Sequence, residues 1–330
     1  MESNNNDNDK DDLINYYNFN EDGSCISIGT KLGFKIVTCE PFSRYHHRKF
    51  GRGIGIVEMY QSSNIIALTG SEINSKYPAN KLIIWDDNKE EIIKEIRVSS
   101  KIRIIKIIKN ILFIVNDVKI YIFNFENLSL INSYEIFSNE KELISFSVNK
   151  NIKIAYISKN QKQIILENID IKKQIKIKND YEELKYIYIH FNIKGDIIAG
   201  AMEGKINLYK TSNGELIREI NNDYLSKRKI NCISFSDKDN YLAVSTLDNN
   251  SGRINIFDIS TKKETGFFDL FMNNKDTCFA HYKMITKGFI FRFYKDSIII
   301  MTSKGNFIKI NIDKENGGYC KKVAFKNVFD

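Results

Sequence analysis

Short apolar runs, separated by Asn, Asp, Gly and Ser, recur along the whole sequence. β-Branched and aromatic residues dominate these runs, and no long segment repeats its apolar residues with the 3.6-residue period of a helix. Runs of this kind, bounded by turn residues, are typical of β-strands. The pattern therefore predicts an all-β protein.

One type of run recurs seven times: a basic or polar residue followed by an apolar alternation that ends in an aromatic or polar residue. It occurs at Phe34–Val37, Lys81–Trp85, Lys119–Phe123, Gln163–Glu167, Lys205–Tyr209, Arg253–Phe257 and Phe307–Asn311. Successive runs are separated by roughly 38 to 54 residues, which brackets the period of a WD-type propeller blade. We therefore expect a seven-bladed, WD-repeat-like β-propeller, with blades beginning near residues 14, 49, 91, 139, 181, 228 and 276.

The two ends of the chain carry separate expectations. A four-stranded blade cannot bury both faces alone, so the blades must stack, and we expect a strand from one terminus to complete the sheet of the other. Residues 1–12 are acidic and poor in apolar residues, which predicts a disordered tail. No linker interrupts the remainder, so residues 13–330 are expected to form a single domain.

Three segments allow two interpretations. Gly51–Gly55 lacks the spacing of a phosphate-binding loop and is interpreted as a turn before a strand. Lys101–Lys109 has the length and the flanks of a strand, although its basic, apolar composition also suits a membrane helix. Phe267–Met272 is either the outer strand of blade six or a loop that contacts a lipid interface. In the second interpretation the contact residues are Phe267, Phe268, Leu270 and Phe271.

Charge is unevenly distributed. Residues 1–22 carry seven acids against one lysine, so the remainder must be +14 to give the whole-chain net charge of +8. Such a surface attracts nucleic acid, acidic protein or anionic lipid, and it also keeps a protein soluble. We expect no nucleic-acid partner, because no aromatic residues interleave with the basic ones and no base-reading motif is present.

Other classes of function find no support in the sequence. The five cysteines form no C-x-x-C pair, His46 and His47 would diverge on an extended chain, and no catalytic motif is present. We therefore expect no enzyme activity, no cofactor and no metal site. No apolar run is long enough for a transmembrane helix and no secretion signal is visible, which predicts a cytoplasmic protein.

Several strings resemble the PROPPINs, the phosphoinositide-binding WD-repeat propellers of autophagy. The closest are Phe19–Cys25 (F-N-x-D), Cys39–Phe42 (C-D/E-P-F/L), Gly53–Met59 (G-x-G-x-V-E-M) and Tyr77–Asp87 (Y-P-P-N-K-V-x-I-W-D-D). Looser matches follow at Ser212–Glu219 and Asn231–Phe235. The resemblance implies a non-enzymatic propeller that binds phosphatidylinositol 3-phosphate and the 3,5-bisphosphate through two pockets on blades five and six. These pockets share an F/L-R-R-G motif, in which each arginine pairs with phosphate.

The sequence departs from the family at these pockets. Ile220–Asp223 aligns with F/L-R-R-G, so both arginines become asparagines and the glycine becomes an acid. Ala199–Met202 aligns with the family's A-T-A-S and lacks both of its hydroxyls. The position of the family's blade-five histidine falls near Glu182. Asp276 or Thr277 stands at the position of a basic residue of the family. Ser245 and Thr246 retain the family's paired hydroxyls, while Asn255 replaces a histidine. Four further bases, Lys227, Arg228, Lys229 and Arg253, are expected to give only weak, salt-sensitive attraction.

Two functions therefore remain open. The first is an autophagy scaffold, monomeric and peripheral on autophagosome-precursor or endosomal and vacuolar membranes, which recruits protein partners while its phosphoinositide binding is degraded. The second is an effector that still reads phosphatidylinositol 3-phosphate or the 3,5-bisphosphate. Asn20 and Asp22 match positions that, in the resembling subgroup, contact a bridge-type lipid-transfer protein. The same residues are also typical of a turn, because Asn and Asp side chains bond to their own backbone.

Overall fold

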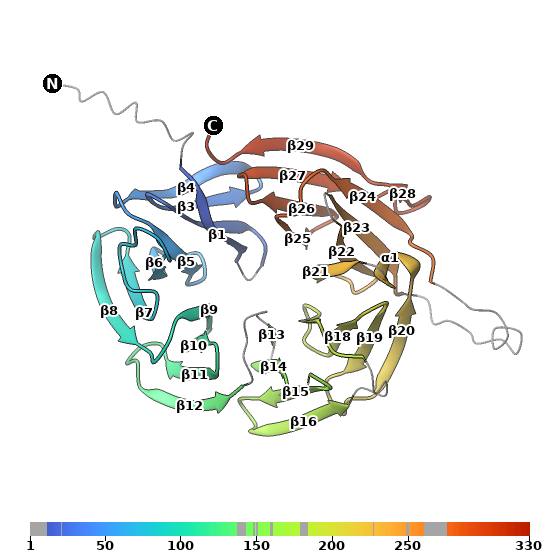
Figure 1. Cartoon of the computed structure of the whole chain (residues 1–330), viewed down its shortest axis with the longest axis horizontal. Helices are drawn as coiled ribbons and strands as arrows, with labels where there is room; N and C mark the ends of the chain where they lie inside the picture. The colour runs from blue at the N-terminus through green and yellow to red at the C-terminus, as the bar shows by residue number, and fades with distance from the viewer. Residues whose placement is uncertain are drawn as a thin grey trace, which may run out of the picture. The chain divides into compact units, whose positions relative to one another are not determined.

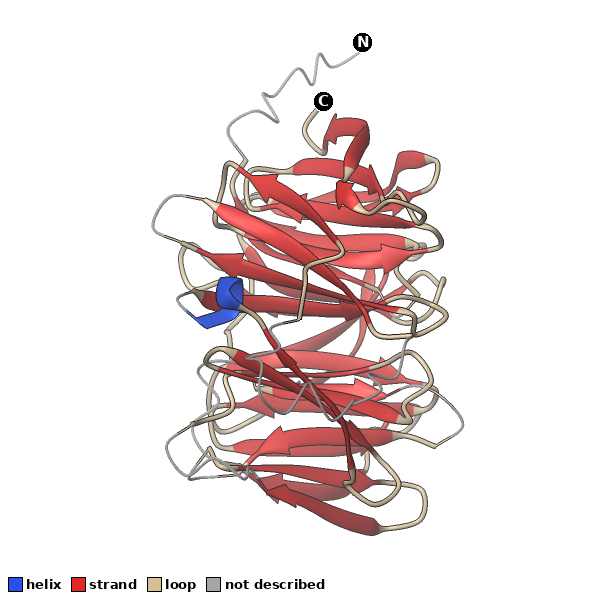
Figure 2. Ribbon diagram, turned by 90° about the vertical axis from the view of Figure 1, so that its right-hand side faces the viewer, coloured by secondary structure: helices blue, strands red, loops and turns tan. Residues whose placement is uncertain are grey.

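The fold consists almost entirely of β-strands (Figure 2). The computed structural model describes residues 12–20, 22–136, 143–147, 149, 151–158, 161–178, 184–226, 228–248, 251–260 and 276–330. Within these residues the one α-helix is α1 (Asp223–Ser226), a single turn. The predicted all-β class is confirmed.

The strands form seven sheets (Figure 1). The first three are β1 (Ile14–Phe19), β2 (Cys25–Thr30), β3 (Gly33–Cys39), β4 (Phe42–Lys49); β5 (Ile54–Met59), β6 (Ile65–Gly70), β7 (Lys81–Asp86), β8 (Glu91–Arg97); and β9 (Ile102–Ile108), β10 (Ile111–Asn116), β11 (Lys119–Asn124), β12 (Leu130–Glu135). The fourth and fifth are β13 (Ile144–Ser147), β14 (Lys153–Ile157), β15 (Gln163–Asn168), β16 (Lys173–Lys178); and β17 (Tyr188–Phe191), β18 (Ile197–Met202), β19 (Lys205–Lys210), β20 (Leu216–Asn221). The last two are β21 (Lys229–Phe235), β22 (Tyr241–Leu247), β23 (Gly252–Asp258), β24 (Ala280–Met284), β28 (Gly318–Tyr319); and β25 (Phe289–Tyr294), β26 (Ser297–Thr302), β27 (Asn306–Asn311), β29 (Lys321–Asn327).

The repeated runs in the sequence correspond to the third strand of each sheet, and Lys101–Lys109 is a strand, β9, as predicted. Two expected boundaries are wrong. The third sheet begins at Ile102 because β8, near residue 91, is the last strand of the second sheet, and the seventh begins at Phe289 because β24 belongs to the sixth. The fourth strand of the sixth sheet is thus β24, and the short β28 pairs with it at the sheet's edge. Phe267–Met272, with its four candidate lipid-contact residues, lies outside the described residues.

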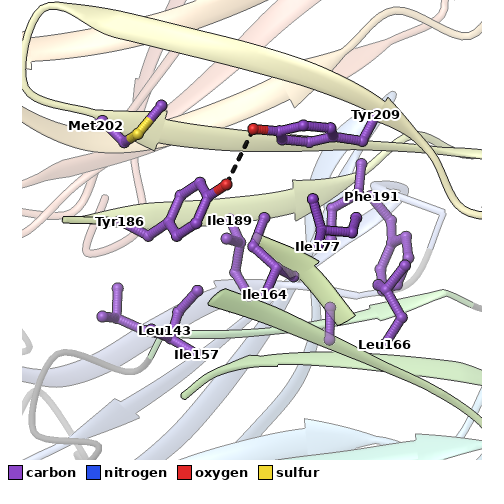
Figure 3. Close-up of a cluster of buried hydrophobic side chains, with 12 residues drawn as sticks. Leu143, Ile157, Ile164, Leu166, Ile177, Tyr186, Ile189, Phe191, Met202 and Tyr209 are labelled. Atoms are coloured by element: carbon purple, nitrogen blue, oxygen red, sulfur yellow. Dashed lines mark hydrogen bonds between the residues drawn. The ribbon is translucent and has the colours of Figure 1, made fainter. Parts of the chain in front are cut away.

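By its internal contacts the chain divides into two compact units, one of residues 1–134, 301–308 and 324–330, the other of residues 135–300 and 309–323. Within each unit the first strands of successive sheets pack together: β5 lies against β1 and β9 in the first, and β17 against β13 and β21 in the second. One core cluster of the second unit joins side chains of the fourth sheet, such as Ile164 and Ile177, to Tyr186 and Phe191 of the fifth (Figure 3). Within each unit, neighbouring sheets thus bury a face on each other.

The predicted exchange of strands between termini is wrong, since the first sheet takes all its strands from the N-terminal segment and the seventh from the C-terminal segment. Instead, the last residues of the chain pack against β3 inside the first unit. The buried Lys35 ammonium lies 4.5 Å from the ring centre of Phe329, and a Cβ at Gly305 would come within 2.8 Å of that ring. Residues 1–11 of the predicted tail lie outside the described residues; Asp12 is buried and accepts a hydrogen bond from the Leu32 amide.

A polar network joins the outer strand of the first sheet to the end of β7. The buried Asp87 carboxylate accepts hydrogen bonds from Arg48 Nε at 2.7 Å and Trp85 Nε1 at 3.1 Å, and it contacts His46 Nδ1. Burial alone would raise the pKa of Asp87, but the hydrogen bonds from Arg48 and Trp85 and the charge of His46 hold that pKa below its ordinary value. The network therefore stabilises the fold only while Asp87 is ionised.

We predict that Asp87→Asn lowers the free energy of unfolding at pH 7 by about 3 kcal/mol, because Arg48 loses its buried partner. The native pKa of Asp87 lies below that of the unfolded chain, so its contribution is complete above about pH 5 and is lost as the pH falls through the native pKa. Urea unfolding from pH 7 to pH 3 should show the difference between variant and wild type shrinking. The exposed Asp296→Asn is the control and should change little. A difference that is constant with pH would contradict the account.

Candidate functional site

The candidate site surrounds the connection between the fifth and sixth sheets, inside the second unit. Asp276, just before β24, and Asn221, at the end of β20, form two hydrogen bonds with each other. The Asn221 amide donates to Asp276 Oδ2 at 3.0 Å, and the Asp276 amide donates to the Asn221 carbonyl at 2.7 Å. Asn222 Nδ2 donates to the Asp276 carbonyl at 2.5 Å. Two segments more than 50 residues apart in sequence are thereby held together.

Asp276 also neutralises a cation. Arg218 Nη2 lies 3.2 Å from Asp276 Oδ1, and the two side chains are 15% and 5% exposed. Beside this pair, Glu219 Oε1 accepts from Asn221 Nδ2 at 2.6 Å and from Lys205 Nζ at 3.1 Å. An incoming phosphate would have to displace carboxylates of the chain itself, and leaving either carboxylate buried without its partner would be costly.

On the fifth sheet, the space beside Gly200 is filled by a side chain. Gly200 stands where the family has a hydroxyl residue, and a Cβ there would come within 2.7 Å of the buried Tyr186 ring. The Tyr186 and Tyr209 hydroxyls lie 3.0 Å apart (Figure 3), and Asn207 Nδ2 donates to Tyr209 at 2.9 Å. The absence of a side chain at Gly200 thus makes room for an aromatic ring. Glu182 lies outside the described residues.

The remaining predicted lipid residues fall into two groups. Ser245 and Thr246 have no solvent exposure, and their hydroxyls bond to the Cys232 carbonyl at 3.4 Å and to Asn255 Nδ2 at 3.2 Å. This placement argues against their direct contact with a headgroup. Two of the described bases, Arg228 and Arg253, lie close to the Tyr224 ring of α1, while Lys227 lies outside the described residues.

Tyr224 lies between two guanidinium groups. The guanidinium carbon of Arg253, on β23, is 4.0 Å from the Tyr224 ring centre, and that of Arg228 is 5.8 Å away. Such distances allow cation–π attraction, which is strongest for Arg253. Burial lowers the pKa of the nearby His281 imidazole, and the charges of Arg253 and Lys283 lower it further. The charges of Arg253 and Lys283 therefore act on His281, on the strand that pairs with β23.

Asn20 and Asp22 both contribute to the turn before β2. Asn20 is buried, its Oδ1 accepts from the Cys25 amide at 2.9 Å, and its Nδ2 donates to Ser24 Oγ at 3.1 Å. Asp22 is exposed and accepts from the Ser24 amide at 2.9 Å. The turn interpretation thus describes both residues, and Asp22 alone of the two presents its side chain to solvent.

The described residues hold neither a metal-binding cluster nor a membrane-spanning helix. No group of three or more His, Cys, Asp or Glu side chains there is arranged to hold a metal ion. None of the helices in this part of the chain is long and apolar enough to cross a bilayer. Sequence reasoning missed the roles of Arg218, Tyr186 and Tyr224. Gly200, flanked by Ala199 and Ala201 in β18, was the one sequence signal that a large side chain could pack there.

Comparisons with known proteins identify the fold and the family. Kluyveromyces lactis Hsv2p superimposes with a TM-score of 0.78 at 20% identity, covering 96% of this chain and 99% of that one. A complex of KlAtg21 with the coiled coil of AgAtg16 gives a TM-score of 0.75 at 18% identity, covering 96% and 99%. These likenesses confirm the predicted seven-bladed β-propeller fold.

Sequence relatives agree. Autophagy-related protein 18 of Kluyveromyces lactis is 36% identical over 137 residues, 42% of this chain, and that of Saccharomyces cerevisiae is 34% identical over 139 residues, again 42%. The matches span only 27% and 28% of those relatives' own length. The PROPPIN family profile matches residues 13–269. The family consists of non-enzymatic autophagy propellers with cytoplasmic, membrane-associated roles and a general capacity to bind phosphoinositides, and this chain belongs to it: it is a PROPPIN.

Proposed function

We propose that this PROPPIN is a scaffold that recruits autophagy proteins, such as a bridge-type lipid-transfer protein, to membranes, and that its phosphoinositide pocket is filled from within. The observation that carries the proposal is the Asp276 carboxylate, which takes hydrogen bonds from the Asn221 amide and Arg218. A carboxylate in this position occupies the donors that a phosphate would need. The alternative, an effector of phosphatidylinositol 3-phosphate or the 3,5-bisphosphate, has no specific contact in its favour among the described residues.

A protein-binding role is supported by the uneven preservation of the family pattern. The strings in the first two sheets match the family closely, whereas Asn221 and Asn222 replace both motif arginines. Neutral drift would have blurred both regions alike. The solved neighbour KlAtg21, in complex with an AgAtg16 coiled coil, is an example of a similar propeller that holds a protein partner. We expect the chain to act as a monomer, peripheral on autophagosome-precursor or endosomal and vacuolar membranes.

The lipid part of the proposal predicts that the wild-type protein floats equally well with two kinds of vesicle. One contains phosphatidylinositol 3-phosphate, and the other carries the same total charge in the form of phosphatidylserine. The comparison is made at about 150 mM salt, where non-specific attraction is screened beyond about 8 Å. Asn221→Arg with Asn222→Arg and Asp276→Ser should create selectivity for the phosphoinositide, because two guanidinium groups then face an open site.

The matched control keeps Asp276 and carries only Asn221→Arg and Asn222→Arg. It should gain much less, because Asp276 already lies against Asn221 and Arg218 and would pair with the new arginines. Selective binding by the wild-type protein would refute a filled pocket. Equal gain by the double and triple variants would show that Asp276 does not block the site.

The partner part of the proposal predicts that Asp22→Asn weakens capture of the lipid-transfer protein without changing stability. The amide oxygen of asparagine still accepts from the Ser24 amide, so the turn is kept while the charge is removed. Asn20→Ala serves as the structural comparison, since it removes a buried turn bond and should cost about 1 kcal/mol in thermal or urea unfolding. If Asp22→Asn captures the lipid-transfer protein as well as the wild type does in a pull-down, the partner role is refuted, and Asn20 and Asp22 serve only to form the turn.

A further inference from the structure

The described chain begins at one corner of the first sheet, beside the turn that joins β2 to β3. The Asp12 carboxylate accepts a hydrogen bond from the Leu32 amide at 3.2 Å, and the Lys31 amide donates to the Leu13 carbonyl at 2.9 Å. Residues 1–11 precede Asp12 directly and lie outside the described residues. The bonds to Asp12 and Leu13 therefore fix the point at which this N-terminal segment joins the first sheet.

Two further connections meet this turn within the first unit. The Leu32 carbonyl accepts from the Gly51 amide at 3.0 Å, in the connection between β4 and β5. Further along that connection, the Gly53 amide donates to the Asn74 carbonyl at 2.8 Å, and the Gly53 carbonyl accepts from the Lys76 amide at 2.9 Å. Asn74 and Lys76 belong to the connection between β6 and β7. Backbone hydrogen bonds thus hold the three connections together.

Each connection contributes an exposed cation, and we call these three residues the basic junction: Lys31, Arg52 and Lys76. None of the three forms an ion pair with a described residue, and the Lys76 ammonium lies 5.7 Å from the Phe50 ring centre. The one acid in these connections, Glu72, pairs with Lys101, which lies outside them. The buried Asp12 adds at most one negative charge, so the junction keeps a net positive charge.

The segment that joins the first sheet at this point has the opposite charge. Residues 1–11 carry four acids and one lysine, and three of the acids, Asp7, Asp9 and Asp11, stand within five residues of Asp12. An extended chain spans at most about 3.6 Å per residue, so these three carboxylates stay within roughly 18 Å of Asp12. A tether this short keeps their effective concentration near the millimolar range. Pairs that are weak between separate molecules can therefore form within the chain.

We propose that residues 7–11 lie over the basic junction, with the carboxylates of Asp7, Asp9 and Asp11 next to its three cations. The occupant is this segment because it is tethered at the edge of the junction and has the opposite charge. The contact goes beyond the proposed scaffold role, since it lies within one chain and involves neither Asp22 nor Asp276.

The position of the junction gives the contact a consequence for partners. Arg52 directly precedes the string Gly53–Met59, and Lys76 directly precedes Tyr77–Asp87. Both strings keep the family pattern closely. The N-terminal segment thus covers cations that border a preserved part of the sequence. An acidic segment of a partner protein that binds at these cations must first displace it.

The test follows the contact by NMR in the full chain, with a nitroxide spin label on Asn6→Cys. The five native cysteines are buried or half-buried, which favours labelling at residue 6. The amide signals of Gly53 and Asn74 should lose most of their intensity and recover it when the nitroxide is reduced. They should also recover in about 1 M salt, where charges are screened beyond about 3 Å. Replacing the three acids by Asp7→Asn, Asp9→Asn and Asp11→Asn should abolish most of the loss.

The junction itself is tested by Arg52→Glu with Lys76→Glu, which should restore the Gly53 and Asn74 signals, because the acids are then repelled. Lys173→Glu with Lys176→Glu is the matched control. It makes the same change of charge at two exposed lysines of β16, in the second unit, and should leave the loss of intensity as in the wild type. Excess free peptide with the sequence of residues 1–11 should displace the segment and restore the signals.

Four results would overturn the contact: no loss of intensity in the wild type, a loss that persists in the triple asparagine variant, equal recovery in both glutamate variants, or no effect of the free peptide. The spin-labelled chain is also mixed with isotopically labelled chain that carries no nitroxide. Broadening in that mixture as strong as within one chain would assign the junction to a second copy and refute the proposal. Capture of the lipid-transfer protein is measured separately, so the contact and the scaffold role can fail independently.

Discussion

A four-stranded sheet has two faces to shield from water, and this requirement governs where the protein can carry a function. Strands such as β2 and β26 are buried along their whole length, so their side chains are committed to packing. Even the space left by Gly200 is taken by the Tyr186 ring. Variable chemistry is therefore confined to the ends of sheets and to the connections between them. The Asp276 contacts lie in such a place.

The same requirement applies at the connection between the fifth and sixth sheets. A buried guanidinium such as Arg218 needs a partner, because a charge without one in the interior costs several kcal/mol. Asp276 supplies that partner and also accepts a hydrogen bond from the Asn221 amide, so an anion of the chain itself lies at this connection. Attraction between cations and anionic lipid needs no cavity, so the proposed membrane recruitment does not depend on a headgroup pocket.

The repeated architecture could be predicted from the sequence, whereas the contacts within the site could not. Third strands such as β7 and β19 are short, buried, largely apolar runs that begin with lysine, so their pattern is clear. Outer strands such as β8 expose consecutive isoleucines, so the apolar pattern does not show where these strands begin and end. Asp276 was recognised as a substitution, but its pairing with Arg218 joins residues 58 apart, and no local pattern reports such a contact.

The central claim is that the anion site between the fifth and sixth sheets is already occupied by the chain. It is tested most directly by following the backbone amide of Asn221 by NMR during titration with the soluble headgroup inositol 1,3-bisphosphate at about 150 mM salt. The account predicts that this amide stays bonded to Asp276 and shows no saturable change in chemical shift. A saturable shift of the Asn221 amide on addition of the headgroup would contradict it.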